Sequence, residues 1–201
     1  MKIKVKIAGL VLALFCSVAL AVQSPLIMMQ GISNQILSGL SKNQDKLQSN
    51  PAIITNLVHN YIIPHVDTQR MAGTVLGRQV WMSATPVQKA QFIKLFTQLV
   101  ISTYSSALAS YNGDVIQFYP IRGSYNQPSV QVNSVIMRRN GQTIAVNYNL
   151  EQVNGSWKIY DFVIENISMV QSYSSQFAGT LAAGGLPALL QKLQQRNGGS
   201  Q

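Results

Sequence analysis

The spacing of apolar residues changes near Gly113, and this change restricts the chain to a fold that contains both helices and a sheet. Before Gly113, apolar residues recur every three or four positions, which is typical of amphipathic helices. After it, Val130, Val132 and Ile136 alternate with polar residues, which is typical of half-buried strands. We therefore expect an α+β fold in which a helical N-terminal half packs on a curved antiparallel sheet.

Start and stop signals predict four helices in the first half. Two starts combine a capping residue with a proline, one is an aspartate, and one is a Thr-Pro-Val-Gln capping box. Proline or glycine marks the end of the second and third helices. The predicted helices begin at Ser24, Asn50, Asp67 and Thr85, and they end near Leu40, Ile62, Gly77 and Tyr111.

Two Asn-Gly pairs, Asn140-Gly141 and Asn154-Gly155, predict hairpin turns in the second half. They join three runs of β-branched and aromatic residues into an antiparallel meander, which a further strand precedes. The predicted strands cover residues 115–119, 130–136, 144–150 and 157–164.

The segment Trp157–Phe177 begins as the last of these strands and continues as a helix. We expect Ser168 to cap this helix near its start, because serine side chains accept hydrogen bonds from free backbone N–H groups. The segment carries almost no chemistry-bearing side chains, which favours a packed or cavity-lining wall. The apolar residues that recur at helical spacing are Ile167, Val170, Tyr173 and Phe177.

The first 21 residues have the three parts of a signal peptide: a lysine-rich start, an apolar run and a small-x-small cleavage site. The apolar run, Ile7–Val18, is shorter than the roughly 20 residues that span a membrane. We expect export and cleavage after Ala21. The predicted organisation is a signal peptide over 1–21, a single domain over 22–196 and a disordered tail over 197–201. Within the domain, an Ala/Gly-rich passage, 178–185, precedes a last helix, Pro187–Arg196.

Cysteine content and charge restrict the possible chemistry and partners. The one cysteine, Cys16, is lost with the signal peptide, so the mature chain has neither disulfides nor a cysteine nucleophile. Removal of the three signal-peptide lysines leaves 12 basic residues against 6 acidic ones, a formal charge of +6. Export argues against nucleic acid as a partner, and Arg138-Arg139 is interpreted as a solvated turn. The charge favours an anionic membrane surface or an acidic protein as a partner.

The polar residues form no recognisable catalytic constellation. His65 and Asp67 are two candidate metal ligands, but the sequence places no third ligand nearby. Asp161 and Glu165 are predicted on one strand face, where a solvated face or a basic partner is favoured over an acid–base pair. No phosphate-binding loop, nucleophile elbow or dinucleotide fingerprint is present. We expect no catalytic residues, no metal site and no enzymatic activity. An exported hydrolase would require a polar cluster around His59 or His65.

Three blocks of sequence follow one another in an order known from a protein family. The first runs from Pro64-His65-Val66-Asp67 through Val75-Leu76-Gly77 to Trp81, and the second from Gln88 through Phe92 and Phe96 to Leu99 and Tyr104. The third contains Trp157-Lys158-Ile159-Tyr160-Asp161, Ile167-Ser168-Met169-Val170 and Ser175-Gln176-Phe177. Together they resemble the MlaC, or toluene-tolerance auxiliary, family of the Mla lipid-transport pathway. Asn166 and Ser174 depart from the Gly and Arg that are usual there.

The resemblance implies a lipid-binding domain that encloses an elongated apolar cavity. Such a protein is a periplasmic carrier that holds a phospholipid by its acyl chains and needs no cofactor. It shuttles lipid between an outer-membrane lipoprotein–porin complex and an inner-membrane ABC transporter with an MCE-domain ring, to maintain outer-membrane lipid asymmetry. A monomer is expected.

The candidates for the cavity lining are apolar residues on predicted helix faces and strands. Because an apolar residue at helical spacing is more often ordinary core, the alternative is a secreted, non-enzymatic adaptor of an envelope assembly with a solid core. The predicted lining residues are Met71, Val75, Leu76, Val80, Trp81, Phe92, Phe96, Leu99, Val100, Tyr104, Val132, Val146, Tyr148, Trp157, Tyr160, Val163, Ile167, Val170, Tyr173 and Phe177.

Overall fold

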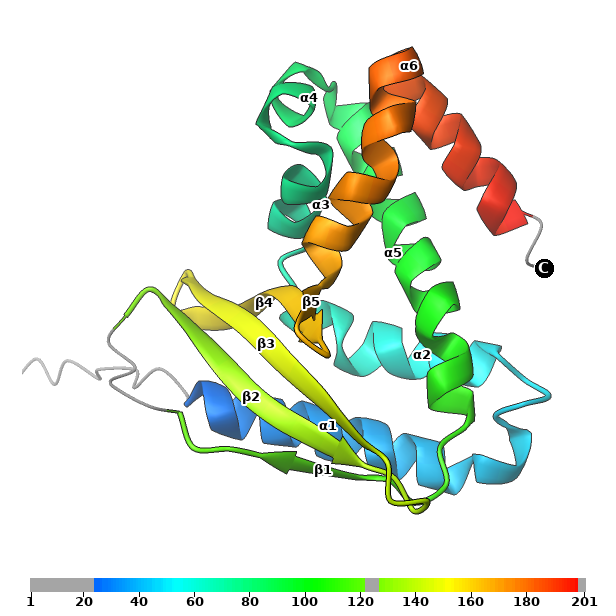
Figure 1. Cartoon of the computed structure of the whole chain (residues 1–201), viewed down its shortest axis with the longest axis vertical. Coiled ribbons are helices and arrows are strands. Elements are labelled where there is room, and N and C mark those ends of the chain that lie inside the picture. The colour runs from blue at the N-terminus through cyan, green and yellow to red at the C-terminus, as the bar shows by residue number, and fades with distance from the viewer. Residues whose placement is uncertain (1–23, 122–126, 199–201) are drawn as a thin grey trace, which may run out of the picture.

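The computed structural model describes residues 24–121 and 127–198, and its helices and antiparallel sheet confirm the predicted α+β class (Figure 1). The predicted signal peptide and residues 199–201 lie outside the described residues. The helices are α1 (Pro25–Lys42), α2 (Ala52–Tyr61), α3 (Thr68–Leu76), α4 (Arg78–Ser83), α5 (Pro86–Ala109) and α6 (Met169–Gly198). The strands are β1 (Val115–Phe118), β2 (Ser129–Met137), β3 (Thr143–Val153), β4 (Ser156–Ile164) and β5 (Ile167–Ser168).

The elements gather at two ends of the molecule. The sheet packs with α1 and α2 at one end, whereas α3, α4 and α6 gather at the other, and α5 runs along both (Figure 1). No helix among the described residues is both long and apolar enough to cross a membrane.

Two of the four predicted helix starts form the side-chain bonds that capping requires. Thr85 forms the complete capping box, and Asp67 accepts a hydrogen bond of 2.8 Å from a backbone N–H of α3. Ser24 occupies the N-cap of α1 but makes no cap bond through its side chain. Pro51, rather than Asn50, occupies the N-cap of α2, so that capping prediction is wrong.

The short helix α4 was not predicted from the sequence. Gly77, with a φ of 77°, ends α3 and is also the N-cap of α4. A Cβ on Gly73 would lie 3.3 Å from the Trp81 indole, so the glycine allows this ring to pack closely on α3. Because α4 contains no fully buried residue, its sequence shows no apolar periodicity.

The sheet has the order β1-β2-β3-β4-β5, with every neighbouring pair antiparallel. The turn between β3 and β4 has positive φ at both Asn154 and Gly155, as a tight type I′ hairpin requires. The connection between β2 and β3 is longer and is closed by a hydrogen bond of 2.9 Å from Arg138 N–H to the Gln142 carbonyl. A register shift between Asn149 and Leu150 interrupts the β3–β4 ladder.

The segment Trp157–Phe177 changes from strand to helix later than predicted. Ile167 belongs to β5 and is 65% exposed, so its predicted place on the buried helix face is wrong. Ser168 does cap α6, because its Oγ accepts a hydrogen bond of 3.2 Å from Gln171 N–H. Asn166, where the MlaC pattern usually has Gly, adopts a φ of 65°, which asparagine tolerates better than most residues.

Helix α6 corrects two further predictions. The Ala/Gly-rich passage is itself helical, so the last helix does not begin at Pro187, and only Gly185, at φ 63° and ψ −165°, interrupts it. Asn197 and Gly198 extend this helix beyond the predicted end at Arg196. The Asn197 side chain donates a hydrogen bond of 3.0 Å to the Leu95 carbonyl, so this residue is anchored to α5 and is not part of a disordered tail.

The buried apolar residues form two clusters. The first, which we call the helical core, lies between α3, α5 and α6, and the second, the sheet core, lies between α1, α2 and the sheet. The helical core consists of Met71, Ala72, Val75, Leu76, Ala84, Phe92, Leu95, Phe96, Leu99, Met169, Val170, Tyr173, Phe177, Leu186, Leu189, Leu190 and Leu193. The sheet core consists of Met28, Met29, Ile32, Ile36, Leu40, Leu47, Ile54, Val58, Ile101, Val132, Val146, Tyr148, Leu150, Trp157 and Ile159.

Candidate functional site

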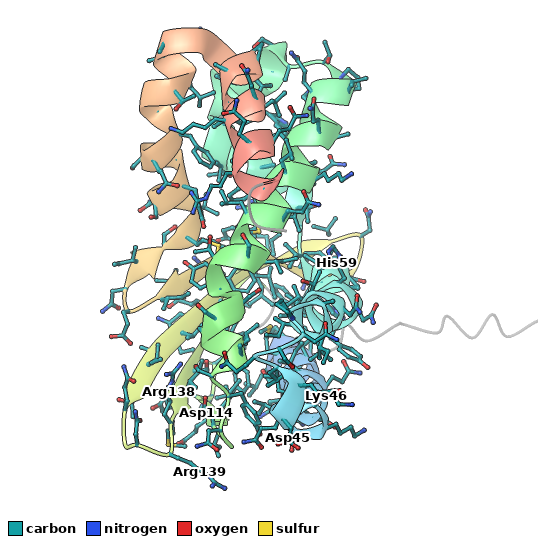
Figure 2. All side chains as sticks on the ribbon, turned by 90° about the vertical axis from the view of Figure 1, so that its right-hand side faces the viewer. Asp45, Lys46, His59, Asp114, Arg138 and Arg139 are labelled. Carbon is teal, nitrogen blue, oxygen red and sulfur yellow. The ribbon has the colours of Figure 1, made fainter. Side chains whose placement is uncertain are left out.

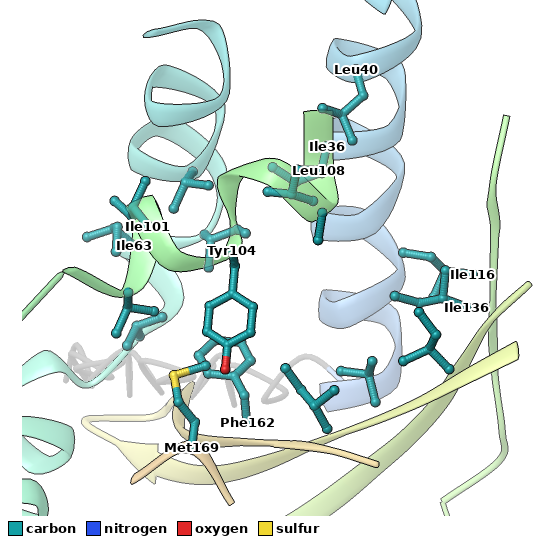
Figure 3. Close-up of a pocket in the computed structure, with 18 of the residues that line it drawn as sticks. Ile36, Leu40, Ile63, Ile101, Tyr104, Leu108, Ile116, Ile136, Phe162 and Met169 are labelled. Atoms are coloured by element: carbon teal, nitrogen blue, oxygen red, sulfur yellow. The ribbon is translucent and has the colours of Figure 1, made fainter. Parts of the chain in front are cut away.

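An apolar pocket of about 420 Å³ lies where the helical core meets the sheet core. All the helices except α4 contribute lining residues, and so do the strands β1 to β4. Figure 3 shows the wall, in which the labelled lining residues are Ile36, Leu40, Ile63, Ile101, Tyr104, Leu108, Ile116, Ile136, Phe162 and Met169.

Helix α5 lines the pocket with residues four positions apart. Phe96, Val100, Tyr104 and Leu108 follow one another at this spacing, and all four line the pocket. Residues four apart lie on the same side of a helix, so a single stripe of α5 forms one wall. The stripe begins in the helical core at Phe96 and continues past it towards the sheet core.

The sheet forms the opposite wall with a row of isoleucines. In the register, Ile116 of β1 lies opposite Ile136 of β2, and Ile136 lies opposite Ile144 of β3. Residues paired across antiparallel strands point to the same face, so the three side chains form one continuous row. Val146 and Ile164 form a second pair on β3 and β4. All five residues line the pocket.

The polar groups of the pocket suit binding better than reaction. Its lining residues include Thr68, Thr97, Tyr104 and Tyr111, which carry hydroxyl groups, and the charged residues Asp114 and Arg138, with no histidine or cysteine among them. Burial raises the pKa of the Tyr104 hydroxyl, and nearby Tyr173 raises it further, so Tyr104 stays neutral at physiological pH. No nucleophile paired with a base is present among the lining residues. The wall can therefore shelter an apolar molecule from water.

The polar residues considered from the sequence have structural positions elsewhere. Asp67 caps α3, and His65 lies in the preceding 3-10 turn, Ile63–His65. Lys158 donates a hydrogen bond of 2.6 Å to the Pro64 carbonyl. His59 lies on α2 outside the apolar pocket. Among the described residues, no group of three His, Cys, Asp or Glu side chains could hold a metal ion.

Asp161 and Glu165 do not form a pair. Asp161 is 7% exposed and accepts hydrogen bonds of 2.7 Å from Ser168 Oγ and 3.1 Å from Val170 N–H, which joins β4 to the start of α6. The prediction of a solvated face or a basic partner is therefore wrong for Asp161. Glu165 is exposed and accepts a hydrogen bond of 2.5 Å from Ala145 N–H.

Most of the predicted lining residues lie in one of three regions. Those that line the pocket are Met71, Phe96, Val100, Tyr104 and Val146. Those buried in or packed against the helical core, away from the pocket, are Val75, Leu76, Val80, Trp81, Phe92, Leu99, Val170, Tyr173 and Phe177. Those buried in the sheet core, away from the pocket, are Val132, Tyr148 and Trp157.

Three predicted lining residues lie outside both cores. Tyr160 is half-buried beneath Arg70, whose guanidinium carbon lies 3.7 Å from the centroid of its ring. Arg70 also forms an ion pair with Glu151, so this contact joins α3 to the sheet. Val163 is half-buried on β4 opposite Asn147 and Ser168, and Ile167 is exposed.

Sequence reasoning missed most of the aliphatic wall. Ile36, Leu40 and Val58 fall within the predicted helices, and Ile136 and Ile144 within the predicted strands, but none of them was predicted to line a cavity. The sequence signal that could have identified this wall is the presence of aliphatic residues on each predicted strand and on each helix that packs near the sheet. That signal does not distinguish a pocket wall from a filled core, because both are apolar.

Comparison with known proteins identifies similar chains of known family. The family model described as MlaC protein matches residues 30–195. The "Intermembrane phospholipid transport system binding protein MlaC" of Haemophilus influenzae is 30% identical over 182 residues, which cover 88% of this chain and 84% of that protein. The "Toluene tolerance protein ttg2D" of Pseudomonas putida is 26% identical over 174 residues, covering 87% of this chain and 80% of that protein.

A solved structure has the same fold. It is a phospholipid-binding protein from Ralstonia solanacearum in complex with a phospholipid, and it is 29% identical to this chain. The TM-score is 0.82, and the superposition covers 88% of this chain and 98% of that one. The likeness thus extends over nearly the whole of the described fold.

Proposed function

Because the chain belongs to the MlaC family, we propose that it is a periplasmic phospholipid carrier whose acyl-chain site is the apolar pocket between the two cores. The observation that carries this proposal is the pocket itself, which has an aliphatic wall on the sheet side and a helical wall on α5. The related protein from Ralstonia solanacearum, solved in complex with a phospholipid, supports it.

The energetics of burial suit such a carrier. Each methylene group removed from water is worth about 0.8 kcal/mol, so two chains of ~16 carbons represent on the order of 25 kcal/mol before costs. The pocket volume of about 420 Å³ lies in the range of ~300–1,000 Å³ typical of ligand sites. A dry cavity of this kind can hold a lipid in water without any catalytic step, and we propose that the protein has no enzymatic activity.

The proposed route runs between two membrane complexes. The carrier receives or delivers phospholipid at an outer-membrane lipoprotein–porin complex and at an inner-membrane ABC transporter bearing an MCE-domain ring. Export through the predicted signal peptide places it in the periplasm as a monomer, where it maintains outer-membrane lipid asymmetry. The name of the Haemophilus influenzae relative, an intermembrane phospholipid transport system binding protein, supports this assignment.

Lipid analysis of the purified protein tests the proposal. Protein isolated from the periplasm and denatured is expected to release phospholipid detectable by mass spectrometry, at a substantial fraction of one molecule per chain. Val100→Trp, which fills the pocket from α5, is expected to reduce that content several-fold. Val87→Trp is the matched control on the same helix, since Val87 is 75% exposed.

Two outcomes would count against this function. Wild-type protein free of lipid, and unable to extract it from vesicles, would contradict a carrier and favour the adaptor. Equal lipid content in Val100→Trp and Val87→Trp would place the lipid elsewhere on the protein.

A further inference from the structure

One end of the apolar pocket carries two opposite charges. Among the described residues that line it, Asp114 and Arg138 alone are charged. Val115 pairs with Met137 at the end of the β1–β2 ladder, and Asp114 and Arg138 are the next residues outward from this pair. Because side chains alternate along a strand, the two lie on the same face as the pocket-lining pair Ile116 and Ile136, which is two residues inward on each strand. Figure 2 shows both residues at this end of the sheet.

Asp114 and Arg138, which are both half-buried, do not form an ion pair with each other within the part of the chain that the structure describes. The Arg138 Nε–H is buried and has no hydrogen-bond partner there. Opposite charges on facing strand residues usually pair, and a buried donor without a partner is unfavourable. The arrangement leaves one cation and one anion available at the end of an apolar wall.

We propose that Arg138 and Asp114 form a headgroup subsite for a zwitterionic phospholipid with a primary amine, a phosphatidylethanolamine. This inference rests on the proposed lipid-carrier function. With the acyl chains against the isoleucine row, the phosphate lies beside Arg138. A small rotation of the guanidinium lets Nε and a terminal nitrogen donate side by side to two phosphate oxygens. The ammonium group of the same headgroup donates to the Asp114 carboxylate.

The pair of charges also implies selectivity. A zwitterionic headgroup matches the zero net charge of the subsite. A phosphatidylglycerol headgroup carries the phosphate without an ammonium group, so the Asp114 carboxylate repels it without compensation. We therefore expect preference for phosphatidylethanolamine over phosphatidylglycerol, by about threefold for a partly solvated charge pair.

The neighbouring Arg139 provides a matched control. It has the same charge and follows Arg138 directly, but it is exposed, and its side chain packs over Gly113 rather than lining the pocket. Arg139→Gln therefore removes the same charge as Arg138→Gln at a residue that does not line the pocket.

The test is competitive lipid uptake by delipidated full-length mature protein. The donor vesicles contain phosphatidylcholine with equal amounts of phosphatidylethanolamine, phosphatidylglycerol and dioleoylglycerol, and mass spectrometry counts the lipids that each variant extracts. Arg138→Gln is expected to lose about tenfold in uptake of all phospholipids while extracting dioleoylglycerol, which has no phosphate, as the wild type does. Arg138→Lys retains most of the uptake. Asp114→Asn loses the preference for phosphatidylethanolamine, and Arg139→Gln matches the wild type.

The outcomes separate this inference from the function on which it rests. If the wild type extracts no lipid, the carrier function fails. If the wild type extracts lipid and Arg138→Gln extracts it equally, or if Arg139→Gln is impaired as much as Arg138→Gln, the headgroup subsite is contradicted and the carrier function is not.

Titration with inorganic phosphate alone distinguishes a site for a free anion from a site for a lipid headgroup. Phosphate binding that Arg138→Gln abolishes, without any change in lipid uptake, would overturn the assignment. Thermal unfolding of each variant confirms folding, and Asp114→Asn tests the subsite independently should Arg138→Gln not fold.

Discussion

The helical core and the wall of the pocket are both apolar, but the interior of the helical core is closely packed, whereas the pocket is an open space. The helical core contains an aromatic cluster in which Phe96 stacks on Phe92 with ring centroids 5.6 Å apart and meets Tyr173 edge-on at 5.2 Å. Phe177 packs edge-on against both phenylalanines at 6.3 Å. At the pocket, the sheet presents the row Ile116, Ile136 and Ile144, and the space in front of it stays open although Phe96, Tyr104 and Phe162 also line it. Ring pairs fill volume in defined geometries, whereas an aliphatic wall can adapt to a flexible chain.

This difference indicates that the helical core contributes mainly to stability and that the pocket is available for binding. Side chains of the helical core that do not line the pocket are closely surrounded by protein atoms, so they gain most of the dispersion energy of packing. Pocket residues lack these contacts on one side, and a bound ligand can supply them. Helix α5 belongs to both regions, so identical substitutions along this helix measure the contrast directly.

The largest effect is expected for Leu99→Ala. Leu99 lies on α5 within the helical core and is 0% exposed. Removing its side chain leaves a cavity in close-packed surroundings and should reduce the free energy of unfolding by about 2–5 kcal/mol. Urea unfolding of delipidated protein measures the change. A loss as small as that of an exposed substitution would mean that the helical core is not well packed.

An intermediate effect is expected for Asp161→Asn, which tests the hydrogen bonds that join β4 to the start of α6. The buried carboxylate accepts hydrogen bonds from Ser168 Oγ and Val170 N–H, and bonds to a charged group are worth about 1.5–3 kcal/mol. The free energy of unfolding should decrease by roughly this amount. Glu165→Gln, on the exposed turn of the same strand, is the control and should cost less. Equal losses for the two variants would contradict a special role for Asp161.

A smaller effect is expected for Leu108→Ala, the counterpart of Leu99→Ala on the same helix. Leu108 is half-buried and faces the pocket, so its removal from delipidated protein should cost about 1 kcal/mol. With phospholipid bound, the cost should rise, because the side chain then contacts an acyl chain. Paired unfolding measurements with and without lipid check this. A cost of Leu108→Ala that is independent of lipid would separate this part of the pocket from the binding site.

The smallest effect is expected for the dependence of stability on pH, to which His65 contributes. Burial lowers the pKa of His65 below its ordinary value of 6.5, and the positive charge of Lys158 lowers it further. The unfolded chain therefore binds a proton more readily than the folded one, and this contribution to stability is lost as pH falls below about 6.5. The melting temperature should decrease slightly on acidification through this range, and less so in His65→Gln. Identical pH profiles for the two proteins would exclude His65 as the cause.

The order of the helices and strands was largely predictable, because caps and tight turns are specified by residues that are close together in the sequence. The capping box at Thr85, the cap at Asp67 and the turn at Asn154-Gly155 each require only a few neighbouring residues, and each is present as expected. Predictions failed where tertiary contacts override local preference. Ile167 became an exposed edge-strand residue because β5 pairs with β4, and Asn197 was ordered by a carbonyl group of α5.

Which apolar residues line the pocket was decided by the tertiary structure alone. The sequence determined that α5 has an apolar stripe and that β1 to β3 alternate, because periodicity depends on backbone geometry. It did not determine what faces each stripe. Phe92 and Phe96 are both on α5, yet Phe92 is packed among rings and Phe96 also reaches the pocket. Only the positions of α3, α6 and the sheet leave space opposite one part of the helix and not the other, since an apolar side chain is equally suited to a protein neighbour and to an acyl chain.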